Sequence, residues 1–281
     1  MKKILFGTIV TMFTLTSLQS TAQMKKGAYV GLNAGYGAAA GAANVLNIEN
    51  SSNTSTIDET EAIKFSFGKG VNAGLSFGYM FNENIGAELG VQYLIGGKTK
   101  YTETNASGGF GSSTFTGDVS AKMVQIKPTI VLATSMKNMT PYAKLGMVIG
   151  SGKITQNNQS TSTGGGATFT TAQKAELKGG MAIGFTAGMG LNFSVNDKLS
   201  INGEVNMVNM QYSPKKGTVI AYSENGVDKL STLSVRDREI EFSKKVTTTS
   251  TPRPNTLPSQ ETSIAMPFGS IGINVGVKYN F

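Results

Sequence analysis

The chain has 281 residues, a formal net charge of +8 and no cysteine, histidine or tryptophan. Its 35 glycines exclude a helical bundle, since each glycine weakens a helix interior by up to about 1 kcal/mol. Charged residues make up only 15% and hydrophobic residues 39%, whereas disordered chains are usually more charged and less apolar. The absence of cysteine means that the fold uses no disulfide.

Residues 1–22 have the features of a secretory signal peptide. Lys2 and Lys3 form the basic end, an apolar run follows at 4–15, and the small residues before Gln23 predict cleavage after Ala22. A retained helical anchor is disfavoured, because a helix needs about 20 apolar residues to span a bilayer. The mature domain is therefore expected to comprise residues 23–281.

Eight segments alternate apolar residues with small or polar ones at a period of two, which is the pattern of β-strands. In one of them, Leu75 and Phe77 alternate with Gly74 and Ser76. The eight predicted strands cover residues 27–38, 68–81, 85–95, 123–133, 142–150, 176–193, 199–208 and 270–281.

The connections between these strands alternate in length. Three are short, at 82–84, 135–139 and 194–198, and four are long and rich in Ser, Thr, Asn and Gly, at 38–63, 96–120, 151–175 and 213–264. Short turns on one side and long loops on the other are typical of an outer-membrane β-barrel, with the short turns in the periplasm. We therefore predict an all-β fold, an eight-stranded antiparallel transmembrane β-barrel with short periplasmic turns and long extracellular loops.

The last long loop contains a second alternating stretch, at 233–246. Its two faces carry charges, with Arg236 and Arg238 on one and Glu239 and Glu241 on the other. A mid-membrane Arg or Lys costs roughly 2–4 kcal/mol, so this stretch is expected to be an extended hairpin in water. Residues 251–262 contain three prolines, which remove backbone donors, and are expected to return without regular structure.

The composition of the less apolar face decides between a membrane barrel and a soluble barrel of the lipocalin type. A soluble barrel would expose many charges, but this face consists mostly of Gly, Ser, Asn and Thr. Small residues suit the crowded lumen of an eight-stranded barrel, so the apolar face is predicted to meet lipid. Every backbone polar group must then be paired, which requires the last strand to pair with the first.

Five charged residues fall on the lumen face near the periplasmic end, and we predict that they form a layer of ion pairs. Glu88 is expected to pair with Lys127, and Glu204 with Lys278, because these residues lie on neighbouring strands. Lys144 would share the acids, since paired buried charge is tolerated where isolated charge is not. A structural plug is favoured over an ion path or gate, because lumens of this size are usually filled.

Nothing in the chain indicates catalysis or a cofactor. Enzymes on such barrels use a histidine as a base near neutral pH, and this chain has none. The acidic stretch 58–61 is interpreted as an exposed loop rather than a metal site. The basic residues do not alternate with aromatic ones, so nucleic acid is not an expected partner.

The predicted signal peptide, the eight strands, the long outer loops and the final "VGVKYNF" at 275–281 together resemble the small outer-membrane β-barrel superfamily. This superfamily includes the outer-membrane protein A and X barrels and the opacity-type surface proteins. The net positive charge leads to the hypothesis that a basic surface associates with anionic lipopolysaccharide. The resemblance implies a multi-pass protein of a Gram-negative outer membrane, in contact with membrane lipids. It also implies that Val277, Tyr279 and Phe281 occupy the places of the signal read by the β-barrel assembly machinery.

The same resemblance implies a non-enzymatic protein that displays its surface loops. Structural support, adhesion, or interaction with a host or an extracellular ligand would follow from those loops. The alternative that it leaves open is a small porin or transport channel.

Overall fold

A computed structural model describes residues 26–44, 46, 49–54, 58–107, 111–134, 139–247 and 253–281. The predicted signal peptide and residues 135–138 of the second predicted turn lie outside this part of the chain. Within it, no helix has the length and apolar character needed to cross a bilayer.

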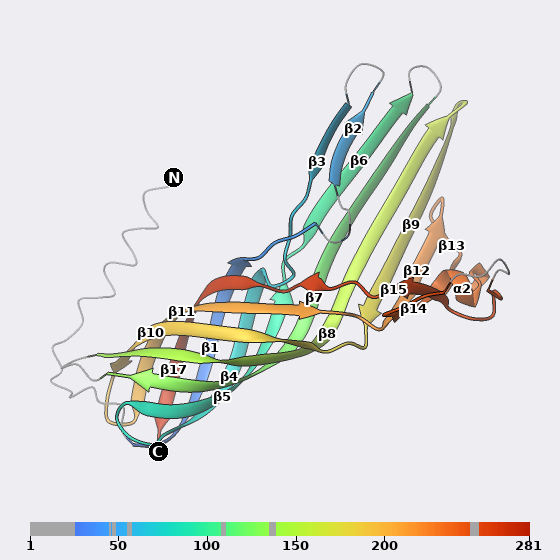
Figure 1. The fold of residues 1–281 in the computed structure, drawn as a ribbon. Helices are drawn as coiled ribbons and strands as arrows, with labels where there is room; N and C mark the ends of the chain where they lie inside the picture. Colours follow the sequence, from blue (N-terminus) through green and yellow to red (C-terminus); the bar gives the residue numbers. More distant parts are fainter. Residues whose placement is uncertain are drawn as a thin grey trace, which may run out of the picture.

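Eight strands form a closed antiparallel ring (Figure 1). Each pairs with the next in chain order, and the ring closes where the last strand pairs with the first, with Leu32 opposite Val277. The predicted barrel is confirmed, and its wall has no free edge inside the membrane. The eight strands are β1 (Gly27–Ala39), β4 (Gly70–Met80), β5 (Ile85–Gly96), β7 (Gly111–Ala133), β8 (Thr140–Gly164), β10 (Ala182–Ser194), β11 (Leu199–Tyr212) and β17 (Ser270–Asn280).

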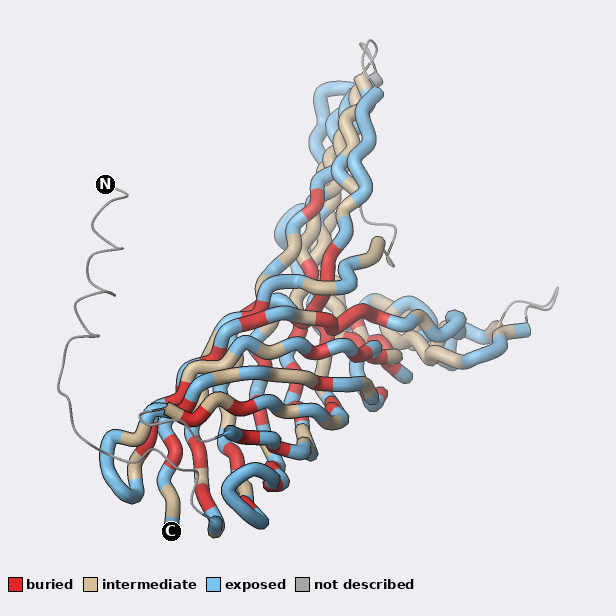
Figure 2. The backbone as a smooth tube through the Cα atoms, turned by 60° about the vertical axis from the view of Figure 1, so that its left-hand side comes forward, coloured by how far each residue is buried: buried red, intermediate tan, exposed pale blue. Residues whose placement is uncertain are grey.

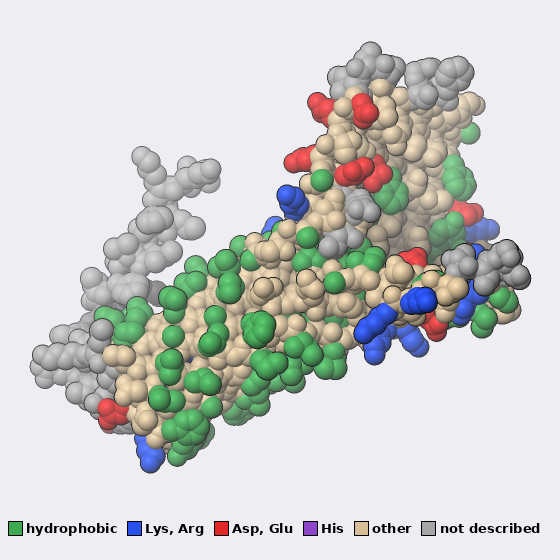
Figure 3. All heavy atoms as spheres, viewed as in Figure 1, with side chains coloured by type: hydrophobic (Ala, Val, Ile, Leu, Met, Phe, Trp, Pro, Cys, Tyr) green, Lys and Arg blue, Asp and Glu red, His purple; other side chains and the backbone are tan. Residues whose placement is uncertain are grey.

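The apolar face of the barrel points outward, as the alternation predicts. Phe77, Leu89 and Val275 have 56%, 46% and 62% of their surface exposed, the reverse of their place in a soluble barrel. Buried and exposed positions alternate along the barrel strands (Figure 2), and hydrophobic side chains cover the visible barrel wall (Figure 3). This wall is the surface that contacts lipid.

Glycine on the inward face makes room for larger lumen side chains. A Cβ on Gly78 would lie 2.1 Å from Cζ of Tyr29, and one on Gly35 would lie 1.8 Å from Oδ1 of Asn274. The narrow lumen therefore holds these polar side chains only because the opposite positions have no side chain.

Two of the periplasmic turns are built in the same way. The Asn82 side-chain Oδ1 accepts hydrogen bonds from the backbone N–H groups of Asn84 and Ile85, at 2.9 and 2.8 Å. Asn196 accepts the equivalent bonds from Lys198 and Leu199, at 2.9 and 2.8 Å. Asparagine stabilises short turns by such bonds, so these connections at 82–84 and 194–198 stay tight.

The expected long loops at 96–120 and 151–175 are largely β-strands. β7 and β8 continue beyond the barrel and pair with neighbouring strands to form what we call the extracellular sheet (Figure 1). Its order is β3, β2, β6, β7, β8, β9, β12, with β2 and β6 parallel and the other pairs antiparallel. The added strands are β2 (Glu49–Asn53), β3 (Asp58–Ala62), β6 (Thr99–Ser107), β9 (Ala167–Lys178) and β12 (Lys216–Glu224), with the short β13 (Val227–Asp228) paired to β12.

These strands escape sequence analysis because water reaches both of their faces over most of their length. Buried positions such as Leu177 and Val219 are confined to the part next to the barrel, so no sustained apolar alternation is present. The threonines of these strands favour extended structure, and the ladders of β7 and β8 supply backbone partners. The predicted strand 176–193 is likewise divided in two, because β9 ends at Lys178 and Gly179 adopts a positive φ of 87° before β10.

The predicted hairpin at 233–246 is wrong. A 3-10 helix, η2 (Leu230–Thr232), and a one-turn helix, α2 (Val235–Arg238), precede the strand β14 (Glu239–Ser243). The Ser234 hydroxyl accepts a hydrogen bond from the backbone N–H of Asp237 and so caps the N-terminus of α2. Sequence analysis missed this helix cap because it considered only the alternation of charges.

The return at 251–262 is also more regular than expected, because β15 (Ser259–Thr262) pairs in parallel with β14. β16 (Met266–Pro267) then pairs with the end of β11 and leads back to the barrel. The prolines at 254 and 258 precede β15 and so remove no donor from its ladder.

Candidate functional site

A cluster of ion pairs crosses the lumen near its periplasmic end. Nζ of Lys144 lies 2.7 Å from Oε1 of Glu88 and 2.9 Å from Oε2 of Glu204. Nζ of Lys278 lies 3.9 Å from Oε2 of Glu88. The structure thus brings together four of the five charged residues singled out in the sequence, and all four are almost completely enclosed.

The partners differ from the expected ones because the contacts cross the lumen instead of following the wall. Glu88 on β5 reaches Lys144 on β8, a strand that is not its neighbour. Lys127 lies opposite Gly90 and donates a hydrogen bond to Gln92, whose amide in turn donates to Asn72. The lumen of an eight-stranded barrel is so narrow that a long side chain reaches the opposite wall as readily as a neighbouring strand.

Two tyrosines that sequence analysis did not single out complete this cluster. The hydroxyl of Tyr29 donates to Oε2 of Glu88 at 2.7 Å, and that of Tyr142 donates to Oε2 of Glu204 at 3.1 Å. Nζ of Lys278 lies 5.0 and 4.6 Å from the centres of the two rings, within cation–π range. The alternation of the sequence could have placed both tyrosines in the lumen. Tyr29 is two residues from the inward-facing Gly31, and Tyr142 is two residues from the inward-facing Lys144.

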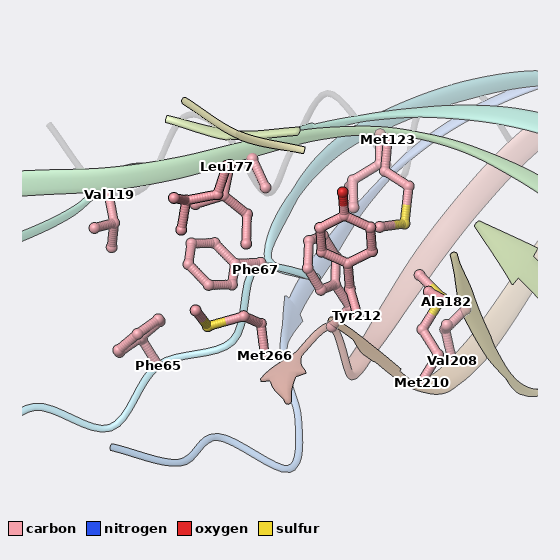
Figure 4. Close-up of a cluster of buried hydrophobic side chains, with 14 of the residues drawn as sticks. Phe65, Phe67, Val119, Met123, Leu177, Ala182, Val208, Met210, Tyr212 and Met266 are labelled. Carbon is pink, nitrogen blue, oxygen red and sulfur yellow. The ribbon is translucent and has the colours of Figure 1, made fainter. Parts of the chain in front are cut away.

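An apolar plug fills the outer end of the lumen (Figure 4). Inward-facing residues of the wall, such as Met123 and Tyr212, meet side chains from the segments that precede β4 and β17. The ring of Phe268 is centred 5.3 Å from that of Phe67 and 5.7 Å from that of Tyr212. The plug comprises Phe65, Phe67, Leu94, Met123, Val148, Val208, Met210, Tyr212, Met266 and Phe268, with further apolar residues around them.

A small polar cavity of about 60 Å³ lies in the lumen, bordered by the ion-pair residues. Asn33, Asn206 and Asn274 also line it. This volume accommodates a few water molecules at most. The lumen is therefore filled by charged and aromatic residues at the periplasmic end and by the apolar plug at the outer end.

A groove of about 720 Å³ is lined by β6, β7, β8, β9 and β12 of the extracellular sheet. The cross-strand register places Tyr101, Asn158, Gln173 and Tyr222 in one row on one face. The Tyr101 hydroxyl donates to Oδ1 of Asn158 at 2.5 Å, and burial raises the pKa of Tyr101. This groove joins residues that are far apart in the sequence, so sequence analysis gave no signal for it.

The three residues of the predicted assembly signal lie on the outer face at the periplasmic end of β17. Val277 and Tyr279 face outward from the strand, and Phe281 is 79% exposed. The rings of Tyr279 and Phe281 pack edge to face, with their centres 5.4 Å apart. Aromatic residues at this level belong to the girdle of a membrane barrel.

Among the residues that the structure describes, no group of three or more acidic side chains is placed to hold a metal ion. Glu176 and Lys178 lie on β9 outside the membrane, where Glu176 pairs with Lys153 at 2.5 Å.

A closed eight-stranded barrel with an apolar outer wall and a polar, filled lumen defines an integral β-barrel membrane protein. Residues 8–236 match the family described as "Outer membrane protein beta-barrel domain", which is more than half of the chain. The chain belongs to this family and is a protein of the outer membrane. No curated protein matches the chain.

Several solved structures are similar to this chain at 12% sequence identity. OprG from Pseudomonas aeruginosa is matched over 92% of this chain and 97% of its own, with a TM-score of 0.41. Neisserial surface protein A is matched over 90% of this chain and 97% of its own, with a TM-score of 0.35. Ail, the attachment invasion locus protein of Yersinia pestis, is matched over 91% of this chain and 100% of its own, with a TM-score of 0.29.

Proposed function

We propose that this protein is a non-conducting, non-enzymatic barrel that holds the extracellular sheet above the outer membrane as a surface for interaction. The observation that carries the proposal is the double blockage of the lumen, by the ion-pair cluster at one end and the apolar plug at the other. A barrel that transported solutes would need a continuous polar path between these ends.

The rigid attachment of the extracellular sheet supports a display role. β7 and β8 run without interruption from the membrane wall into the sheet, and they pair over their outer lengths as well. Such strands keep a fixed geometry relative to the membrane, whereas flexible loops lose entropy on binding. The lack of histidine supports the absence of catalysis, since no side chain titrates near pH 7 without a strong environmental shift.

The groove on the extracellular sheet is the proposed place for a ligand. Its lining combines amides and tyrosines, and its charges balance, with Lys100 and Lys174 against Asp118 and Asp228. Amide side chains offer donors and acceptors together, so the groove suits an uncharged chain of hydroxyl-bearing units, such as a glycan. Adhesion to a host or to neighbouring cells would follow from such binding.

Biogenesis completes the proposal. Residues 1–22 are proposed to direct export and to be removed, leaving the barrel domain 23–281. Val277, Tyr279 and Phe281 are proposed to be read by the β-barrel assembly machinery, to which their exposed outer face is accessible.

Single-channel recording in a planar bilayer tests the main claim. The wild-type barrel should give no steady conductance, and a variant with Phe67→Ala, Met266→Ala and Phe268→Ala should stay closed because the ion-pair cluster still blocks the other end. Adding Glu88→Ala, Lys144→Ala and Lys278→Ala opens both ends and should produce a leak. Steady, reproducible conductance of the wild-type protein would replace the display role by the small channel.

Binding to an array of neutral glycans tests the groove separately. A Gln173→Ala, Tyr222→Ala variant should lose the binding that the wild type shows. The matched control variant, Gln211→Ala, is exposed on β11 outside the groove and should retain it. Glycan binding that is equal in the groove variant and the control would contradict this assignment.

A further inference from the structure

Four lysines form one row across four neighbouring strands outside the barrel. Lys122 on β7 is directly opposite Lys153 on β8, Lys153 is opposite Lys178 on β9, and Lys178 is opposite Lys216 on β12. We call these four residues the lysine row. Directly opposite residues point to the same face with Cβ atoms about 5 Å apart, so the four ammonium groups share one surface.

This surface is the outer one, continuous with the lipid-facing wall. On β7, Lys122 lies between the buried Ala121 and Met123. It is therefore on the same face of the strand as the exposed Val124. On β9 and β12, the buried Leu177 and Gly217 occupy the opposite face. The lysine row therefore points away from the plug and the groove face of the sheet.

The protein itself neutralises the lysine row only in part, because two of the four lysines have an acidic neighbour. Glu176 pairs with Lys153 at 2.5 Å, and Glu241 lies opposite Lys216 in the register. Within the described residues, Lys122 and Lys178 make no ion pair. Like charges directly opposite each other destabilise a sheet, so this arrangement has a cost unless an anion binds to it.

The lysine row lies just beyond the edge of the apolar surface. Val124, 45% exposed, is two residues from Lys122, and Met181, 64% exposed, is three residues from Lys178. At about 3.3 Å per residue the lysines are within roughly 7–10 Å of the last lipid-facing side chains. The headgroup layer extends about 5–8 Å beyond the hydrocarbon on each side, so the ammonium groups reach it. Figure 3 shows basic side chains where the hydrophobic surface of the barrel ends.

We propose that the lysine row binds the phosphate groups of lipopolysaccharide in the outer leaflet. The lysine ammonium group binds phosphate as a point charge, without a fixed geometry. Two adjacent ammonium groups can therefore bind the oxygens of one doubly charged phosphate. The location selects a lipid-borne phosphate, because the acyl chains of the same molecule would cover the exposed wall below Val124 and Met181. The site is independent of the groove and of the proposed display role, since it lies on the opposite face of the sheet.

The test uses the full barrel in phosphatidylcholine nanodiscs, with and without added diphosphoryl lipid A. The row variant carries Lys122→Gln, Lys153→Gln, Lys178→Gln and Lys216→Gln. The matched control variant has the same change of charge at basic residues away from the row, Lys26→Gln, Lys64→Gln, Lys198→Gln and Lys229→Gln. Retained lipid A is counted by mass spectrometry, and its affinity is measured by titration.

A lysine near an anionic surface is expected to contribute about a fivefold gain in affinity. The row variant should therefore lose lipid A binding by at least tenfold, and monophosphoryl lipid A should bind the wild type less tightly than the diphosphoryl form. The control variant should keep wild-type affinity. Equal loss in both variants would overturn the proposal, since it would show a general charge effect.

Two further measurements distinguish a lipid site from a structural role of the lysines and from a site for free phosphate. In phosphatidylcholine alone the row variant should unfold at the same temperature as the wild type or higher, because repulsion is relieved. A lower unfolding temperature together with unchanged lipid A binding would assign the lysines a structural role and refute the proposal. Inorganic pyrophosphate should compete only weakly; competition as tight as that of lipid A would mean a site for free phosphate instead.

Discussion

The substitution Lys144→Met tests how much the lumen ion pairs contribute to stability. Lys144 is the bridge of the cluster, 2.7 Å from Glu88 and 2.9 Å from Glu204, and both carboxylates are at most 12% exposed. Methionine preserves most of the side-chain volume but leaves these buried charges with only Lys278, at 3.9 Å from Glu88. Breaking a buried pair from one side costs about 3–5 kcal/mol, and this is the expected loss in free energy of unfolding.

The measurement is guanidinium unfolding of the barrel refolded in phosphatidylcholine vesicles, followed by far-ultraviolet circular dichroism. The chain has no tryptophan, so the β signal is the direct probe. An unchanged slope with a lower midpoint would indicate a change in stability alone. The matched control is Lys153→Met, whose pair with Glu176 is 44% exposed on the lysine side and should contribute no more than about 1 kcal/mol.

A second substitution checks the electrostatic cause. Adding Glu204→Gln to Lys144→Met removes one of the two carboxylates that have lost their ion pair, and Glu88 keeps Lys278. The double variant should therefore be more stable than Lys144→Met alone. The reasoning is refuted if Lys144→Met is no worse than Lys153→Met, or if the double variant is the least stable of all.

Three other perturbations have clear expected outcomes. Leu89→Arg places a charge on the lipid face and should lower the free energy of unfolding by roughly 2–4 kcal/mol in the same vesicle assay; no loss would contradict its contact with lipid. Gly78→Ala puts a methyl group 2.1 Å from Cζ of Tyr29, so it should break the hydroxyl bond to Glu88 and cost about 1–3 kcal/mol. Adding Tyr29→Leu should restore part of that loss, and a failure to do so would show that the clash is elsewhere. Phe268→Ala removes a ring that is 1% exposed within the apolar plug and should cost about 3–5 kcal/mol, measured by the same unfolding transition, whereas a near-neutral result would mean that the plug contributes little.

The sequence by itself determined the membrane wall. A period of two is visible wherever one face meets lipid and the other a crowded lumen, so all eight wall strands and the outward direction of Leu89 and Val275 were predictable. The same parity placed Glu88, Lys127, Lys144, Glu204 and Lys278 on the inward face. Tyr29 and Tyr142 fall on the same inward face. Their role could not be predicted, because it depends on hydrogen bonds to Glu88 and Glu204 across the lumen.

The tertiary structure alone decided what closes the lumen and what stands outside it. Phe67 and Phe268 belong to segments without alternation, and they meet only because β4 and β17 both pair with β1. The extracellular strands have water on both faces over most of their length, so the contrast in polarity that reveals a strand in the membrane is largely missing there. Which lysines come to lie opposite each other depends on the register of four strands separated by long stretches of sequence, because backbone pairing sets that register and the identity of single residues does not.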